Sequence, residues 1–179
     1  YFIGNAAKEL SEYTRDLLTF TENAQIDVSQ CTMVDLVQLV DGLNSLLTKN
    51  TGVEVIYNKE SPPIFASQVG LKQILHNLIS NGIRYRNPES SAPFVKIKMK
   101  EDKAYYRFSV KDNGQGISKK RMNNIFELFQ KDPTHPDSNG LGLNIVKRLV
   151  EKMDGTVEVK SKVGKGTTIT FTIKKITSN

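Results

Sequence analysis

Lys111-Asp112-Asn113-Gly114-Gln115-Gly116, followed by Ile117, is the stretch from which the chain is best interpreted. An alternating apolar pattern that ends at Val110 leads into it, and a polar, helix-like segment follows it. A strand that ends in one acidic residue and two spaced glycines could form the floor of a binding pocket for a planar ligand. The carboxylate can accept hydrogen bonds from a ring amine, and the glycines let the backbone come close. In isolation the pattern fits a strand followed by a glycine turn equally well.

The composition is that of a globular protein. The chain has 179 residues, 38% of them hydrophobic and 25% charged, which is enough for one sizeable domain and an appendage. A single cysteine, Cys31, excludes a disulfide within the chain and favours a reducing compartment. There is no run of about 18 apolar residues and no signal-peptide pattern. We therefore expect a cytoplasmic fragment, beginning at Tyr1, of a longer parent whose membrane attachment stays open.

The formal net charge is +6, yet the basic residues form no dense stripe in the sequence. Lys96, Lys98 and Lys100 alternate along one expected strand, a pattern typical of a solvated face. From this pattern we expect no nucleic-acid partner and no membrane contact by this fragment.

Residues 1–24 carry apolar side chains at steps of three and four, which predicts an amphipathic helix. Nothing close in sequence covers its apolar stripe, so we expect it to pack on a partner helix or on a second copy of itself. Docking on its own domain is the alternative. The expected domains are 1–26, a dimerisation helix, and 27–179, the main domain.

The order of elements after this helix predicts a two-layer α/β sandwich, a mixed sheet with helices on one face. Residues 60–63 are expected to form a linker, and residues 131–139 a polar loop. The core face of the longest helix should run from Val69 through Leu78 to Ile83. The expected elements are helices over 33–47, 67–85, 119–129 and 140–153, and strands over 53–58, 94–100, 104–110, 157–159 and 168–173.

The longest helix holds Asn77 and Asn81 one turn apart on one face. Amide oxygens can ligate a hard cation such as Mg²⁺ that bridges phosphates, although an asparagine pair can equally cap backbone or face solvent. Arg84, a further turn along, supplies a charge for phosphate oxygens.

Two glycine turns complete the set of motifs. Asn139-Gly140-Leu141-Gly142-Leu143 leads into a helix, whose N-terminus suits anionic oxygens. Gly164-Lys165-Gly166-Thr167-Thr168 joins two strands and by itself is a hairpin turn.

Each motif is weak alone, but their order resembles the N, G1, F, G2 and G3 boxes of the histidine-kinase catalytic and ATP-binding domain. This domain belongs to the GHKL (Bergerat-fold) ATPase superfamily, and the resemblance covers about residues 33–175. Residues 73–86 are similar to a kinase N box with two departures: Gly82 where alanine is usual, and Arg84 where lysine is usual. The F box corresponds to Ile125-Phe126-Glu127-Leu128-Phe129.

The resemblance implies ATP and Mg²⁺ as ligands. Asp112 would bind the adenine amino group, Asn81 would ligate Mg²⁺ with help from Asn77, and Lys131 would reach the γ-phosphate. Asn77, Arg84 and Lys131 would be the catalytic residues, while Phe126 and Phe129 would anchor an ATP lid over about residues 118–139. The residues that it assigns to nucleotide binding are Asn77, Asn81, Arg84, Tyr85, Asp112, Gly114, Gly116, Ile117, Phe129, Gly140, Leu141, Gly142, and Thr167 or Thr168.

The chemistry that the resemblance favours is phosphoryl transfer. ATPases of the same superfamily, such as gyrase B and MutL, have a glutamate one turn before the Mg²⁺ asparagine, where it can activate water. Asn77 stands at that position here and cannot act as a base, so we expect transfer to a protein acceptor. The acceptor histidine of such kinases lies on the first helix of a dimerising hairpin. Residues 1–24 resemble the second helix of that hairpin.

The fragment is therefore expected to bind Mg-ATP without phosphorylating itself, with a homodimer partner and a response-regulator receiver domain as partners. His76 is expected to be structural or exposed, because it is offset by about 100° from Asn77 on the helix, and His135, which lies between prolines, is expected to be solvated. Neither has the acceptor's sequence context. Two alternatives remain: a non-catalytic nucleotide-sensing or dimerisation module, and a serine kinase of the anti-sigma type. Nucleotide titration with Mg²⁺ separates the first of these from a kinase.

Overall fold

The computed structural model describes residues 27–128, 130 and 140–176. The expected helix and domain at residues 1–26, and the expected loop over 131–139, lie outside the described residues. Five described strands form one mixed sheet. They are β2 (Glu54–Ile56), β4 (Phe94–Glu101), β5 (Tyr105–Asp112), β6 (Val157–Lys162) and β7 (Gly166–Lys174). The strand order is β2-β4-β5-β7-β6, with β2 parallel to β4 and the other neighbours antiparallel.

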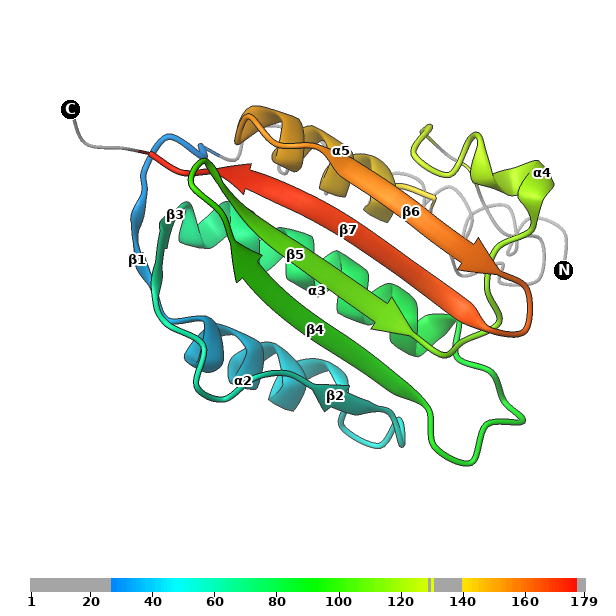
Figure 1. The fold of residues 1–179 in the computed structure, drawn as a ribbon. Helices are drawn as coiled ribbons and strands as arrows, with labels where there is room; N and C mark the ends of the chain where they lie inside the picture. The colour runs from blue at the N-terminus through cyan, green and yellow to red at the C-terminus, as the bar shows by residue number, and fades with distance from the viewer. Residues whose placement is uncertain (1–26, 129, 131–139, 177–179) are drawn as a thin grey trace, which may run out of the picture.

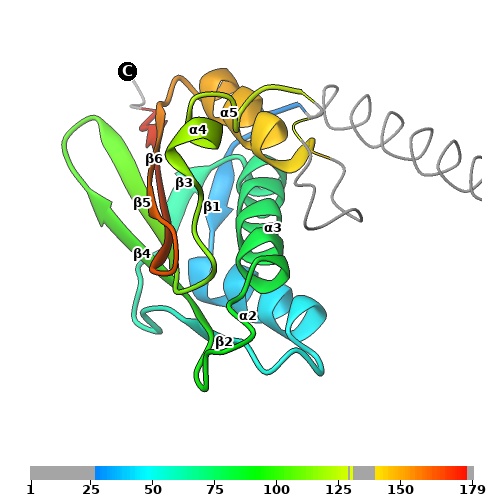
Figure 2. The ribbon, with the colours of Figure 1, turned by 90° about the vertical axis from the view of Figure 1, so that its right-hand side faces the viewer.

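Three helices, α2 (Leu36–Leu47), α3 (Gln68–Arg84) and α5 (Gly142–Lys152), cover one face of this sheet, and its other face is bare (Figure 1, Figure 2). The core lies between the two layers. Phe108 and Phe171 are directly opposite each other on β5 and β7, and their rings stack with centroids 4.8 Å apart. The predicted two-layer α/β sandwich is confirmed. No helix of the described residues is long and apolar enough to cross a bilayer.

A second, two-stranded sheet of β1 (Thr32–Val34) and β3 (Ile64–Ala66) was not expected from the sequence. The predicted helix start at Met33 is therefore wrong, because Met33 pairs with Phe65 in this sheet and α2 begins only at Leu36. Asp35 caps α2 by accepting a hydrogen bond from the amide of Gln38 at 3.0 Å. Three-residue strands are too short to show a period of two, so the sequence pattern missed both.

The long helix α3 agrees with its prediction except at Val69. Ser67 caps its N-terminus by accepting a bond from the Gly70 amide. Val69 was expected on the core face but is 59% exposed, because it lies in the first turn, on the side away from the sheet. Gly82 is buried against β4, and a Cβ there would lie 2.4 Å from Cγ2 of Val95. The absence of a side chain at Gly82 therefore lets α3 approach β4.

The helix predicted over residues 119–129 is shorter than expected, since α4 spans Lys119–Met122. Beyond it the amide of Asn124 bonds to the Arg121 carbonyl, and the amide of Glu127 bonds to the Asn124 carbonyl. Bonds between residues three apart give successive turns instead of an α-helix. The last helix, α5, begins at Gly142 instead of Gly140.

Candidate functional site

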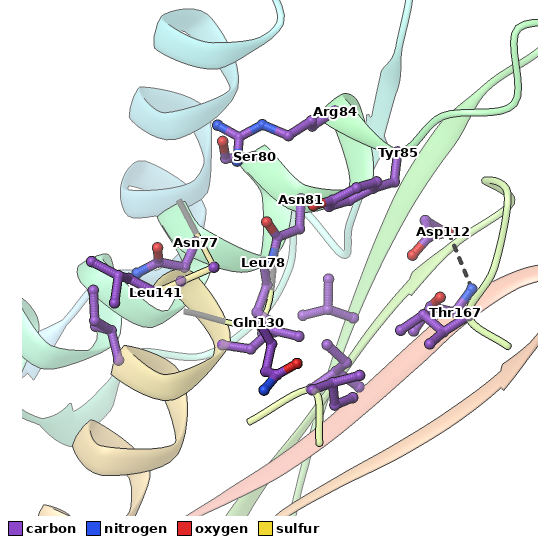
Figure 3. Close-up of a pocket in the computed structure, with 18 of the residues that line it drawn as sticks. Asn77, Leu78, Ser80, Asn81, Arg84, Tyr85, Asp112, Gln130, Leu141 and Thr167 are labelled. Atoms are coloured by element: carbon purple, nitrogen blue, oxygen red, sulfur yellow. Dashed lines mark hydrogen bonds between the residues drawn. The ribbon is translucent and has the colours of Figure 1, made fainter. Parts of the chain in front are cut away.

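A cavity of about 270 Å³ lies between α3, the start of α5, the inner side of β5 and β7, and the chain after β5 (Figure 3). Its walls bring together residues from all the motifs that the sequence singled out. The predicted residues that line it are Asn77, Asn81, Arg84, Tyr85, Asp112, Gly116, Ile117, Gly140, Leu141, Gly142 and Thr167. The structure gives the positions of these residues, and the ligand that each of them binds stays a prediction.

One face of α3 forms a polar wall of the cavity. Asn77, Asn81 and Arg84 lie along it at helical spacing, as the sequence predicted. The side-chain Nδ2 of Asn77 donates to the Gln73 carbonyl at 2.9 Å, so its Oδ1 is turned toward the glycine turn before α5. A Cβ on Gly142 would lie 3.1 Å from that oxygen. The glycine thus leaves room beside an oriented amide oxygen.

The start of α5 faces this polar wall. Gly140 has a φ of 68°, a backbone conformation that favours glycine. The N-cap position is held by Leu141, and no side-chain cap bond forms there. The amides of the first turn of a helix suit an anion, because their partial positive charges point out of the helix. This end of the cavity is suited to phosphate oxygens.

Asp112 lies across the cavity from Asn81 (Figure 3). Its Oδ1 accepts hydrogen bonds from the amides of Gly114 and Thr167, at 2.8 and 3.1 Å. Among the described residues both side-chain bonds of this carboxylate fall on Oδ1, which leaves Oδ2 to accept from a ligand. Burial raises the pKa of Asp112 above its ordinary value, and the backbone amides of Gly114, Thr167 and Asp112 itself partly offset this rise.

The two glycines after Asp112 allow this turn to pack closely against other segments of the chain. A Cβ on Gly114 would lie 2.3 Å from the Tyr85 carbonyl oxygen, and one on Gly116 would lie 2.2 Å from the Lys162 carbonyl oxygen. Gly116 also has a φ of 72° and lines the cavity, whereas Gly114 is not among the lining residues. The first glycine therefore packs the turn against the end of α3, and the second packs it against β6.

Of the two threonines that the resemblance assigns to nucleotide binding, Thr167 and Thr168, the structure places only Thr167 in the cavity wall. Thr168 is the register partner of Lys111 and Lys160, whose side chains point to the bare face of the sheet. Successive residues of a strand point to opposite faces, so Thr168 is directed away from the cavity.

Ser161 on β6 was missed by the sequence reasoning, although it joins two of the motifs. Its hydroxyl oxygen accepts a hydrogen bond from the Ile117 amide at 2.8 Å, and its hydroxyl group donates one to the Gly166 carbonyl at 3.0 Å. The Thr167 hydroxyl lies 2.9 Å away and is the donor in that pair. Since the amide of Thr167 holds Asp112, Ser161 positions the residues around the carboxylate.

We predict that Ser161→Ala lowers adenine-nucleotide affinity about three- to tenfold and the free energy of unfolding by about 1–2 kcal/mol. The reason is that the Ile117 amide loses its acceptor and the Gly166 carbonyl its donor. Calorimetric titration with ADP and urea unfolding measure the two effects. Ser109→Ala, on β5 of the same sheet but on its outer face, is the matched control and should change neither. An unchanged ADP affinity in Ser161→Ala would contradict the positioning role.

The described part of the F box is tied to α5. Asn144 donates its side-chain amide to the Phe126 carbonyl at 2.8 Å, while its own Oδ1 is buried without a partner among the described residues. Ile125 lines the cavity, whereas Phe126 is not among the lining residues. Phe129 and Lys131 lie outside the described residues, so their roles in binding and catalysis stay predictions.

The cavity wall also contains residues that the sequence reasoning assigned to no site. His76 was expected to be structural or exposed, yet it is half-buried and lines the cavity. Burial, aided by Lys72, lowers the pKa of His76, which therefore stays neutral at pH 7. The remaining additions are Gln73, Leu78, Ser80, Val110, Arg121, Ile125, Gln130, Leu143, Ile145 and Ile169.

The family follows from a comparison with known proteins. Residues 66–177 match the model of the family described as Histidine kinase-, DNA gyrase B-, and HSP90-like ATPase. The chain belongs to this family. The match contains all of the α3, β5, α5 and β7 residues that line the cavity.

Within this ATPase family the chain is similar to sensor kinases. It is 33% identical to the heme sensor protein HssS of Staphylococcus saprophyticus, over 94% of this chain and 37% of HssS. It is 37% identical to the sensor histidine kinase WalK of Bacillus subtilis, over 71% of this chain and 22% of WalK. The crystal structure of full-length ShkA in complex with AMPPNP aligns with a TM-score of 0.75 at 27% identity, over 98% of this chain and 38% of ShkA. The chain spans less than two fifths of each of these proteins.

Proposed function

We propose that this chain is the catalytic domain of a sensor histidine kinase. It binds Mg-ATP in the cavity and transfers the γ-phosphoryl group to a histidine on a helical hairpin, for relay to a response-regulator aspartate. The resemblance to HssS and WalK supports this proposal, and the AMPPNP complex of ShkA supports an adenine nucleotide as the ligand. The observation that carries it is the amide of Asn77 at the place where an ATPase needs a carboxylate.

The polarity of the cavity suits ATP in one orientation. The carboxylate of Asp112 is at one wall and can accept from the adenine amino group through Oδ2. Arg84 and the first turn of α5 supply positive charge on the opposite side. An ATP bound the other way would bring its phosphates against a carboxylate, which costs free energy in a partly buried site.

The residues present fit a magnesium ion held jointly with phosphates. No group of three or more His, Cys, Asp or Glu among the described residues could hold a metal. The oriented Oδ1 of Asn77 and the amide of Asn81 are instead the hard neutral donors of the cavity. Asn81, with Asn77, would hold the ion, which when bound neutralises charge on the phosphates.

The side chain at position 77 argues against water activation. A carboxamide has no basic lone pair at neutral pH, and the Nδ2 of Asn77 is already bonded to the Gln73 carbonyl. The contribution of this chain is therefore to orient the γ-phosphate through Asn77, Asn81 and Arg84. His76, whose imidazole is a base, also lines the cavity, and the experiment below tests it separately.

The assembly around this domain is part of the same proposal. Residues 1–26 would form the second helix of the dimerisation hairpin, and the receiver domain of a response regulator would be the downstream partner. A cytoplasmic location fits both partners. The similarity to sensor kinases supports these assignments.

We predict that the chain alone releases phosphate from ATP no faster than its Asn81→Ala variant. Asn77→Glu should raise this rate by at least about tenfold, because it restores a general base one turn before the magnesium asparagine. A coupled phosphate-release assay measures both. ATP turnover by the wild type that is lost in Asn81→Ala would instead place the chain among the ATPases. Turnover that is lost in His76→Gln would assign the base to His76.

A further inference from the structure

The sheet face turned away from the helices is bare in both views (Figure 1, Figure 2), and three of its strands place basic side chains on it. They alternate with Val95, Ile97, Phe108, Val110 and Val159, which point to the core, so all of them point to the bare side. All are exposed except Lys96, which is half-buried. This basic face consists of Lys96, Lys98, Lys100, Arg107, Lys111, Lys160 and Lys162.

The strand register places like charges directly against each other on this face. Lys96 is opposite Lys111, and Lys100 is opposite Arg107, in the antiparallel pair of β4 and β5. Lys160 lies two strands further along the row of Lys111. Like charges at directly opposite positions destabilise a sheet. The sequence showed the alternation on one strand, whereas only the register shows that the cations of three strands meet.

The charges of the basic face are not balanced by neighbouring acids. Glu158 is the one acidic residue among the outward positions of β4, β5, β7 and β6, and Glu54 lies beyond them on the edge strand. With Glu158, the seven residues of the basic face carry a net charge of +6, and Lys174, at the outward end of β7, is paired with Asp154. None of the seven forms a salt bridge within the described residues. Four other lysines do so, in the pairs Lys59–Asp41, Lys147–Glu151, Lys174–Asp154 and Lys175–Glu101.

Contrary to the expectation from the sequence of no membrane contact, we propose that the basic face docks on an anionic lipid surface. The face is about 14 Å across and about as long. None of its residues lines the cavity described above or the hollow between β3, the end of α5 and the end of β7. A broad array of lysines suits a plane of phosphates, since the lysine ammonium is a flexible point charge that does not require the fixed bidentate geometry of an arginine contact. Proteins that read a duplex insert a helix or ribbon into a groove. The outward aromatics of this face, Phe94 and Tyr105, are half-buried, and the exposed Val163 lies in the turn beyond β6, so no exposed aromatic or apolar side chain stands among the lysines for stacking on bases or for insertion among lipid chains.

Docking on this face would leave the nucleotide cavity open. The cavity is on the helix side of the sheet, where Val110 and Ile169 point inward to line it. The basic face points the other way, as the edge-on view shows (Figure 2). Lipid binding is therefore expected to be purely electrostatic, reversible by salt and independent of nucleotide.

Co-sedimentation of the 179-residue chain with vesicles tests this proposal. We expect binding to phosphatidylcholine vesicles that contain about one third phosphatidylserine, at about 0.1 M NaCl, and release at about 0.5 M. Vesicles of phosphatidylcholine alone should not bind. The triple variant Lys98→Gln, Lys100→Gln and Lys160→Gln should bind on the order of a hundredfold more weakly, because each removed lysine lies at the lipid surface.

A charge-matched control removes the same three charges from elsewhere, in Lys49→Gln, Lys72→Gln and Lys147→Gln, and should keep vesicle binding. The basic-face triple variant should retain ADP binding and unfold at the same or a higher temperature, because it loses no attractive contact. Equal loss of binding in both triple variants, or no preference for the anionic vesicles, overturns the proposal. Displacement of the wild type from vesicles by an equal charge concentration of duplex DNA also overturns it, in favour of a nucleic-acid surface.

Discussion

Replacing Asp112 with asparagine should weaken binding of ADP and ATP by about a hundredfold while the fold stays intact. The asparagine Oδ1 can still accept from the amides of Gly114 and Thr167, which now bond to the carboxylate. Its Nδ2, in place of Oδ2, would present a donor to the adenine amino group, which is itself a donor. Calorimetric titration with ADP measures the loss. Asp102→Asn, at an exposed turn that caps two amides in the same way, is the matched control.

The pKa of Asp112 gives this prediction a second readout. Because burial raises the pKa of Asp112, the folded protein holds this proton more tightly than the unfolded chain does. The ionised form therefore costs folding free energy at neutral pH; this cost decreases as the pH falls through the raised pKa and is gone below the ordinary pKa of an aspartate. The ligand-free Asp112→Asn protein should thus be at least as stable as the wild type at pH 7. A large drop in its unfolding temperature, or unchanged ADP affinity, would contradict the account.

Asn81→Ala should abolish phosphoryl transfer, by at least about a thousandfold, because transfer depends on the metal-phosphate geometry that this amide would hold. Without magnesium, the nucleotide affinity of Asn81→Ala should be close to that of the wild type, since the adenine contact at Asp112 remains in both proteins. Label transfer to an acceptor hairpin measures the first effect, and titration with and without magnesium measures the second. Asn58→Ala, an exposed asparagine beyond β2, should behave as the wild type. Full transfer activity in Asn81→Ala would remove this residue from the site.

The spacing of the asparagines carried the most reliable structural information in the sequence. Asn77, Asn81 and Arg84 needed only the helical period to be placed on one face, and the structure puts all three in the cavity wall. The expected strand before Asp112 is also confirmed, and it delivers the carboxylate to the opposite wall. Local periodicity was sufficient at these positions because each element is long.

Contacts between distant segments could not be predicted in this way. Ser161 meets Ile117 across 44 positions of sequence, and nothing in the pattern of β6 marks this serine. The glycines after Asp112 show the same limit. Their spacing predicted a close approach, but the groups that approach are the carbonyls of Tyr85 and Lys162. A register or a tertiary contact decides such roles, and a single sequence contains neither.

The most direct test of the central claim is transfer of the γ-phosphoryl group from labelled ATP to a kinase helical hairpin that carries an acceptor histidine, supplied in trans. We predict label on the hairpin that is labile in acid and stable in base, absent when the acceptor histidine is replaced by glutamine. The label should also be absent when the chain carries Asn81→Ala, and the chain itself should stay unlabelled. Phosphate released to water at the same rate with and without the hairpin, with no label on its histidine, would contradict a kinase.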